Sequence, residues 1–168
     1  MSFLFQSARL GFRTWTEADL PLARALWGDP AVTRYIGGPQ TEAQSRDRLH
    51  LEMRNQQQRG YSCWPIFALA DGAHAGCAGL KPYADDPATL EVGVHLARLF
   101  WSGRYGEEAA RGVMEQGFAA HGAQTLVARH HPDNANSRAL VQRLGFIYSH
   151  DEFWAPNRVD CPTYFLRR

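Results

Sequence analysis

Two kinds of hydrophobic pattern predict the strands of this chain: alternation of apolar and polar residues, and short apolar runs bounded by turn residues. The strongest pair of strands surrounds Asp71-Gly72, a dipeptide that favours a tight hairpin turn. The predicted strands are residues 8–13, 64–70, 75–81, 89–96, 125–129, 146–154 and 163–167.

Apolar residues three or four positions apart, preceded by capping residues, predict the helices. Thr16 and Thr41 each stand three places before a residue that can complete a capping box. Asp29-Pro30 combines a capping residue with proline at the first helical position. Gly122 and Gly145 stand where two helices should end. The predicted helices are residues 16–26, a short one starting after Asp29, and residues 41–59, 105–120 and 136–144.

The order of these elements predicts an α+β fold. Residues 89–129 read as strand, helix and strand, which predicts two parallel strands joined by a right-handed crossover. The strands before them follow one another through short turns and are expected to be antiparallel. We expect one domain, residues 1–168, because the length suits a single domain and the chain contains no internal repeat and no interdomain linker.

Composition narrows the class of protein. With 45% hydrophobic and 21% charged residues the chain has an ordinary globular composition, and a net charge of +1 gives no footprint for nucleic acid. No apolar run approaches the ~18 residues that cross a membrane, and the N-terminus lacks a signal-peptide pattern, so we expect a cytoplasmic protein. Three widely spaced cysteines favour free thiols in a reducing compartment. His130-His131 is not expected to bind a metal, because neighbours on a strand point to opposite faces.

A short loop, residues 102–106, precedes the helix predicted from residue 105 and could bind a phosphate group. The N–H groups of a helix N-terminus and the positive end of its dipole favour anions. Gly103 and Gly106 allow close approach of the backbone, and Arg104 adds a cation. The alternative is a simple turn. Glu107 and Glu108 would repel an anion that they faced, so we expect them to point to solvent.

Several segments together resemble the GNAT family of N-acetyltransferases, in the RimJ/RimL-like branch that acetylates N-terminal amines of ribosomal proteins. They are residues 13–20, 29–35, 76–80 and 101–106. The last segment falls on the family's acetyl-CoA motif Q/R-x-x-G-x-G/A, with Trp101 at its first position, as is usual in this branch. Arg104 stands in place of the central glycine, and Gly103 lies one position earlier.

The resemblance implies a mixed, mostly antiparallel sheet that splays between the strands at residues 89–96 and 125–129. Helices would cover both faces, and acetyl-CoA would lie in the split. Backbone groups near Val94 and Leu96 would hold the pantetheine arm and polarise the thioester. The implied cofactor-binding residues are Val94, Leu96, Trp101, Ser102, Gly103, Arg104, Tyr105, Gly106, Asn134 and Ser137.

Two residues are candidates for catalysis. Ser137 matches a family hydroxyl near the sulfur and would protonate the leaving thiolate; the alternative is a helix-start serine that bonds the backbone. Glu91 shares a strand face with Gly93 and His95, and a carboxylate with a raised pKa in a half-buried cleft can serve as base through a water. The alternative for Glu91 is a partner for an arginine. His95 is expected to shape the substrate-binding cleft, and the resemblance places Tyr35 there as well.

These features predict direct acetyl transfer from acetyl-CoA to a primary amine. An N-terminal α-amine, with a pKa near 8, is neutral far more often at neutral pH than a lysine with a pKa of about 10.4, so a protein or peptide N-terminus is the expected acceptor. The alternatives are a small-molecule amine and a non-catalytic acyl-CoA-binding sensor. We expect acetyl-CoA and the amine as partners, with no metal, nucleic acid or membrane, in a monomer or homodimer.

Overall fold

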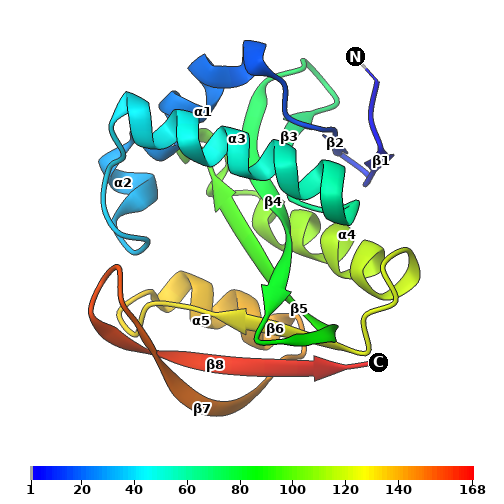
Figure 1. Cartoon of the computed structure of the whole chain (residues 1–168), viewed down its shortest axis with the longest axis vertical. Coiled ribbons are helices and arrows are strands. Elements are labelled where there is room, and N and C mark those ends of the chain that lie inside the picture. Colours follow the sequence, from blue (N-terminus) through cyan, green and yellow to red (C-terminus); the bar gives the residue numbers. More distant parts are fainter. Residues whose placement is uncertain (1) are drawn as a thin grey trace.

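The computed structural model describes residues 2–168 and contains an eight-stranded sheet in the order β1-β2-β3-β4-β5-β6-β8-β7 (Figure 1). All neighbouring strands are antiparallel except β5 and β6, which are parallel. The α+β class and the mixed sheet are therefore confirmed. The strands are β1 (Phe5–Gln6), β2 (Leu10–Phe12), β3 (Cys63–Ala68), β4 (His74–Tyr83), β5 (Asp86–Leu96), β6 (Thr125–Arg129), β7 (Ile147–Trp154) and β8 (Val159–Arg167).

The sheet splits between its two parallel strands. β5 and β6 pair only from Thr89 opposite Thr125 to Glu91 opposite Val127, and β5 then continues to Leu96. Figure 1 shows the two strands close together at one end and diverging from there. On its other side β5 stays paired with β4 as far as Leu96 opposite Gly76. The second half of β5 therefore has one edge without a strand partner among residues 2–168.

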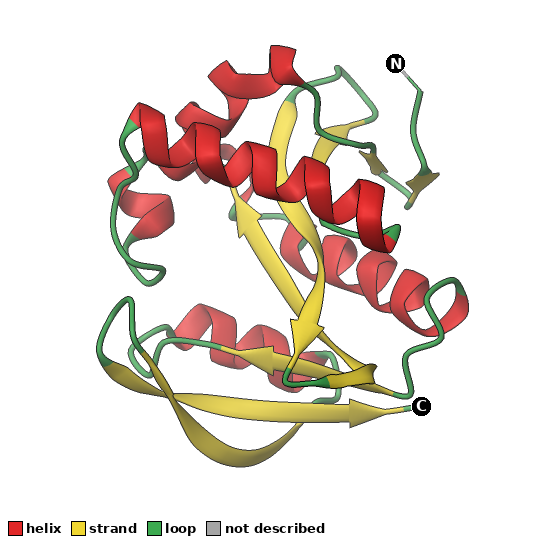
Figure 2. Cartoon of the chain, viewed as in Figure 1, coloured by secondary structure: helices red, strands yellow, loops and turns green. Residues whose placement is uncertain are grey.

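Helices lie on both faces of the sheet, as the resemblance implied (Figure 2). On one face α1 and α3 pack around Trp27, Leu49 and Cys77. On the other face α4 contributes Val113 to a second cluster, which also contains Ala78, the neighbour of Cys77 on β4. The helices are η1 (Glu17–Asp19), α1 (Leu20–Trp27), α2 (Pro30–Thr33), α3 (Glu42–Arg59), η2 (Arg98–Phe100), α4 (Tyr105–Ala119) and α5 (Ala135–Arg143).

Local signals explain where α3 begins and ends. The backbone N–H of Thr41 donates to Oε1 of Gln44 at 2.8 Å, and the N–H of Gln44 donates to the Thr41 hydroxyl at 3.2 Å, which is a complete capping box. The helix ends at Gly60, whose φ of 78° is left-handed. These contacts fix one wall of the cleft described below.

Some predicted boundaries were wrong. The helix predicted at residues 16–26 is divided into η1 and α1, because Pro21 has no N–H and fits only the first turn of a new helix. β8 begins at Val159 and not at residue 163, since Pro162 interrupts the pattern of a strand without ending this one. β1 and η2 were not predicted, and both are too short for a periodic pattern.

Candidate active site

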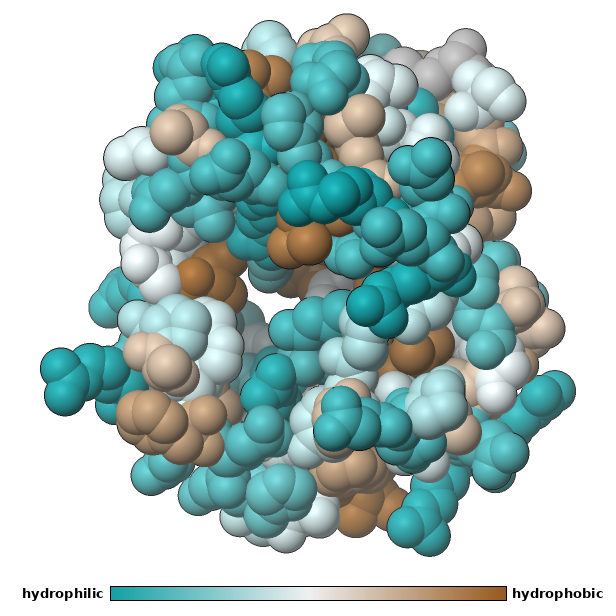
Figure 3. Space-filling model, in the orientation of Figure 1, coloured by the Kyte–Doolittle hydropathy of each residue, from teal (hydrophilic) through white to brown (hydrophobic). Residues whose placement is uncertain are grey.

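A cavity of about 260 Å³ lies between α3 and the diverging strands β5 and β6. Figure 3 shows the same face of the molecule hollowed between its upper and lower halves. It brings together six residues that the sequence predicted as site residues: Tyr35, Glu91, Val94, His95, Asn134 and Ser137. Leu96 and the loop residues 101–106 do not line this cavity; they follow along the chain from the end of β5.

The loop that precedes α4 keeps a glycine-type backbone although Arg104 replaces the motif glycine. Gly103 has a φ of 71° and Arg104 a φ of 59°, so both adopt the left-handed conformation. The indole N–H of Trp101 donates to the carbonyl of Leu96 at 2.8 Å and ties the loop to the end of β5. The Leu96 carbonyl therefore already accepts a hydrogen bond from within the protein.

The expectation that Glu107 and Glu108 point to solvent was wrong. Their side chains are 14% and 15% exposed, because nearby arginines hold them against the molecule. Glu107 pairs with Arg111 at 3.0 Å and Arg143 at 3.2 Å, and Glu108 pairs with Arg9 at 2.6 Å. The pKa of Glu107 is lowered, chiefly by the hydrogen bond from Arg111. Burial acts to raise the pKa of Glu108, but hydrogen bonds from Ser7 and Arg9 outweigh it and lower that pKa.

The start of α5 separates the roles of Asn134 and Ser137. Oδ1 of Asn134 accepts the backbone N–H of Ser137 at 3.1 Å, so Asn134 caps the helix. The hydroxyl of Ser137 makes no hydrogen bond within the described part of the chain, and the residue lines the cavity. The capping role considered for Ser137 thus belongs to Asn134, and the Ser137 hydroxyl is available to a ligand.

Glu91 lies in an ion-pair network where the split begins. Its carboxylate contacts Nη2 of Arg129 at 2.6 Å and Nζ of Lys81 at 3.0 Å. Arg129 in turn contacts Glu152 at 3.0 Å, which joins β5, β6 and β7. Burial acts to lower the pKa of Arg129, but these carboxylates outweigh it and raise that pKa. Glu91 therefore has the arginine partner that was weighed against its role as base, and it still lines the cavity.

His95 lies in the wall of the cavity between β5 and the helices above it. Its Nδ1 is 3.4 Å from the indole nitrogen of Trp27, 3.4 Å from Nη2 of Arg48 and 3.8 Å from Sγ of Cys77. Because Trp27 and Arg48 both offer N–H donors to this nitrogen, the contacts fit the tautomer in which Nδ1 accepts. These contacts hold the ring in place, which agrees with a role in shaping the cleft.

Two charged cavity residues on α3, Arg48 and Glu52, were missed by sequence reasoning. Glu52 is only 9% exposed, and its Oε2 accepts the backbone N–H of Cys63 at 2.9 Å. Burial raises the pKa of the Glu52 carboxyl. The signal was present: Ser45, Leu49 and Glu52 follow the spacing of one helix face, so Glu52 occupies a position of the buried stripe.

Beside them lies a pair of thiols. All three cysteines are free, as expected, and Sγ of Cys63 lies 3.1 Å from Sγ of Cys77 across β3 and β4. Burial acts to raise the pKa of Cys77, but hydrogen bonds with Cys63 and His95 lower it well below its ordinary value. The same contact and burial raise the pKa of Cys63.

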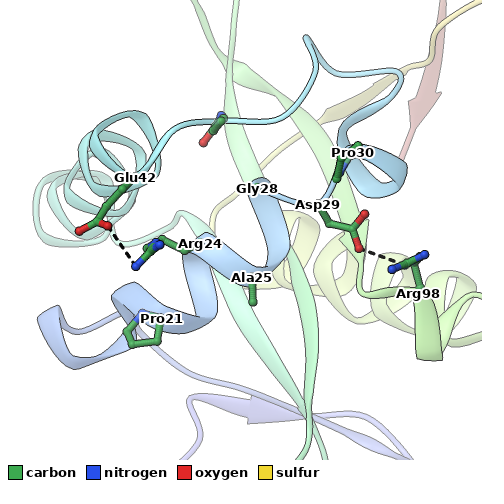
Figure 4. Close-up of a pocket in the computed structure, with 9 residues that line it drawn as sticks. Pro21, Arg24, Ala25, Gly28, Asp29, Pro30, Glu42 and Arg98 are labelled. Carbon is green, nitrogen blue, oxygen red and sulfur yellow. Dashed lines mark ion pairs between the residues drawn. The ribbon is translucent and has the colours of Figure 1, made fainter.

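A second, more open hollow of about 630 Å³ lies on the outer side of α1 and α2 (Figure 4). Its charged side chains pair with one another, Arg24 with Glu42 and Arg98 with Asp29, each at 3.0 Å. None of the sequence-predicted site residues lines it. The cavity at the split of the sheet is therefore the candidate active site.

Within residues 2–168 no cluster of three or more histidine, cysteine, aspartate or glutamate side chains has a geometry that could hold a metal ion. Among the helices that the structure describes, none is both long and apolar enough to span a bilayer.

A split mixed sheet, with a helix N-terminus following the splayed strand, defines an acyltransferase of the GNAT class. The family model described as "Acetyltransferase (GNAT) domain" matches residues 9–147. The chain belongs to the GNAT acetyltransferase family, whose members use acetyl-CoA.

Relatives of the chain agree with this assignment. It is 29% identical over 143 residues to the uncharacterized protein YkkB of Bacillus subtilis (strain 168), covering 84% of this chain and 83% of that protein. It is 26% identical over 144 residues to the uncharacterized N-acetyltransferase p20 of Bacillus licheniformis, covering 82% and 79%. Among solved structures, the apo form of RimL, a ribosomal L7/L12 α-N-protein acetyltransferase, superimposes with a TM-score of 0.84 at 16% identity, covering 99% and 94%. That likeness is one of fold.

Proposed function

We propose that this acetyltransferase moves the acetyl group of acetyl-CoA directly onto an α-amino group, at the N-terminus of a protein or peptide or on a small molecule of that type. The observation that carries the proposal is one cavity that holds Glu91, Asn134 and Ser137 beside the unpaired edge of β5. Ion pairs hold the carboxylate of Glu91, and the helix cap holds Asn134 and the backbone of Ser137, so their placement is largely set before a substrate binds.

The residues at the split fit acetyl-CoA. The pantetheine arm carries amide groups, and the β5 edge after Glu91 offers backbone donors and acceptors that no strand uses in the described structure. The start of α4, with Arg104 as its N-cap residue, suits the pyrophosphate, because helix N–H groups and a nearby cation both favour phosphate oxygens. Bound acetyl-CoA supplies the acetyl group as a thioester.

The chain's own residues would supply the proton transfers. The Ser137 hydroxyl donates a proton to the departing sulfur and is reprotonated from solvent, and a backbone N–H near Val94 stabilises negative charge on the carbonyl oxygen. Glu91 accepts the surplus amine proton through a water, with Lys81 and Arg129 holding its carboxylate in place. Glu52, which is buried and has no arginine or lysine partner in the described structure, is the alternative acceptor of that proton.

The experiment compares two peptides as acceptors, one with a free N-terminus and no lysine, the other blocked at the N-terminus and carrying one lysine. We expect kcat/KM for acetyl transfer to be higher by about tenfold or more for the peptide with the free N-terminus, because its amine is neutral far more often than that of lysine. Faster transfer to the lysine peptide would overturn the α-amine assignment. If acetyl-CoA binds and no amine in a broad panel is acetylated, the catalytic function fails.

A further inference from the structure

The cavity contains two arginines, and only one of them has an acidic partner. Arg129 contacts the carboxylates of Glu91 and Glu152. Arg48 forms no ion pair with any carboxylate of residues 2–168. Its Cζ lies over the ring of Trp27, 4.3 Å from the centroid, and its Nη2 is 3.4 Å from Nδ1 of His95. A guanidinium held in place by an aromatic ring and a histidine keeps most of its donors for a ligand.

Glu52 lies one helical turn after Arg48 on the same helix, and both side chains line the cavity. Residues four apart on a helix are neighbours, so an ion pair between them would be expected on an ordinary surface. None forms here: Glu52 accepts the N–H of Cys63, and Arg48 stacks on Trp27. One wall of the cavity therefore presents a positive and a negative group that are separately held.

We infer that Arg48 binds a carboxylate of the acceptor while Glu52 binds its ammonium group, so that the enzyme prefers amines that carry an acidic group close by. This inference rests on the proposed function and narrows its substrate class. The carboxylate has two possible sources: the α-carboxylate of a free amino acid, or the side chain of an acidic first residue in a peptide. In both, Arg48 can form two parallel hydrogen bonds with the carboxylate.

The experiment uses acceptor pairs that differ by one carboxylate, with kcat/KM expressed per neutral amine because the carboxylate also raises the pKa of a neighbouring amine. Free L-amino acids are compared with their amides, and peptides beginning with Asp or Glu are compared with those beginning with Asn or Gln. We expect kcat/KM to favour the charged member of at least one pair type by about tenfold or more, the range of a hydrogen bond to a charged group. The pair type that shows the preference identifies the source of the carboxylate.

Substitutions then connect the preference to Arg48. Arg48→Gln should abolish the preference by raising KM for the charged acceptors, with kcat for the neutral ones little changed. Arg54→Gln is the matched control, because Arg54 lies exposed on the same helix and outside the cavity. Glu52→Gln should lower kcat/KM for charged and neutral acceptors alike, because both kinds of acceptor carry the amine.

The outcomes separate this inference from the function on which it rests. If kcat/KM for the acceptors without the carboxylate equals or exceeds that for their charged counterparts, the inference alone is overturned. A preference that survives in Arg48→Gln, with correct folding confirmed by its melting temperature, would also overturn it. Absence of transfer to every amine would overturn the proposed function instead.

Discussion

At the scale of single residues, Ser137 has the clearest catalytic prediction. Because the side-chain Oδ1 of Asn134 caps α5 by accepting the backbone N–H of Ser137, a bond that alanine at position 137 can still donate, Ser137→Ala should leave stability almost unchanged. It should lower kcat by roughly 10² to 10⁴ while the affinity for acetyl-CoA, measured by calorimetry, stays the same. Asn134→Ala is the contrasting variant: it removes the cap, costs about 1 kcal/mol of stability and weakens acetyl-CoA binding first. A Ser137→Ala enzyme with normal kcat would exclude the hydroxyl as the proton donor.

Glu52 should make stability depend on pH. Burial raises its pKa in the folded protein above the unfolded value, so the folded state holds the proton more tightly and stability falls as pH rises between the two values. In Glu52→Gln this contribution is absent, while the amide oxygen can still accept the N–H of Cys63. The free energy of unfolding of Glu52→Gln relative to the wild type should therefore rise with pH through that window and then level off. Denaturant titrations at a series of pH values measure it, and a difference that is flat with pH would contradict the assignment.

At the scale of elements, Arg104 places a side chain where the loop before α4 needs a left-handed backbone. That conformation costs a non-glycine residue on the order of 1–2 kcal/mol, partly offset in a glycine variant by the greater freedom of its unfolded chain. Arg104→Gly should therefore raise the free energy of unfolding by up to about 1 kcal/mol, and weaken acetyl-CoA binding in a salt-dependent way through loss of the cation. Arg158 is the control, since its φ of 53° is also left-handed and it lies in the turn between β7 and β8. Arg158→Gly should give the stability gain without the change in affinity; equal loss of affinity in both would remove Arg104 from the phosphate site.

The junction from β2 to α1 depends on Asp19. Its carboxylate receives two hydrogen bonds from Arg13, at 2.7 and 2.6 Å, and further ones from Thr16. Burial acts to raise the pKa of Asp19, but these bonds outweigh it and lower that pKa. A depressed pKa gives stability that is present above the unfolded value and is lost as pH falls through the folded one. Asp19→Asn should thus cost about 1–3 kcal/mol at neutral pH and much less in acid, whereas Glu17→Gln, at an exposed position of the same turn, should change little. An Asp19→Asn penalty that does not shrink in acid would refute this ion pair's contribution.

At the scale of the whole molecule, the sequence predicted the elements that build the site better than the contacts inside it. Periodicity and capping residues predicted the bounds of α3, α4 and β6 almost correctly, because these signals are local in the sequence. The order of strand, helix and strand predicted that β5 and β6 are parallel, and the family resemblance implied that these two strands splay apart. The partners of Glu107 and Glu91 could not be found this way, since Arg143 and Arg129 are 36 and 38 positions away in the chain. Arg48 and Glu52 were overlooked because a charged pair on a polar helix usually faces solvent. The spacing of Glu52 from Leu49 indicated a buried position, but the cavity that both residues face is visible only in the packed structure.

The central claim is that acetyl-CoA lies in the split between β5 and β6, with its reacting end in the cavity beneath α3. A crystal structure of the protein with bound CoA tests it most directly. We expect the pantetheine arm along the β5 edge after Glu91, the sulfur within hydrogen-bonding distance of the Ser137 hydroxyl, and the pyrophosphate at the start of α4. CoA bound in the hollow of Figure 4, or with its sulfur away from Ser137, would contradict the account.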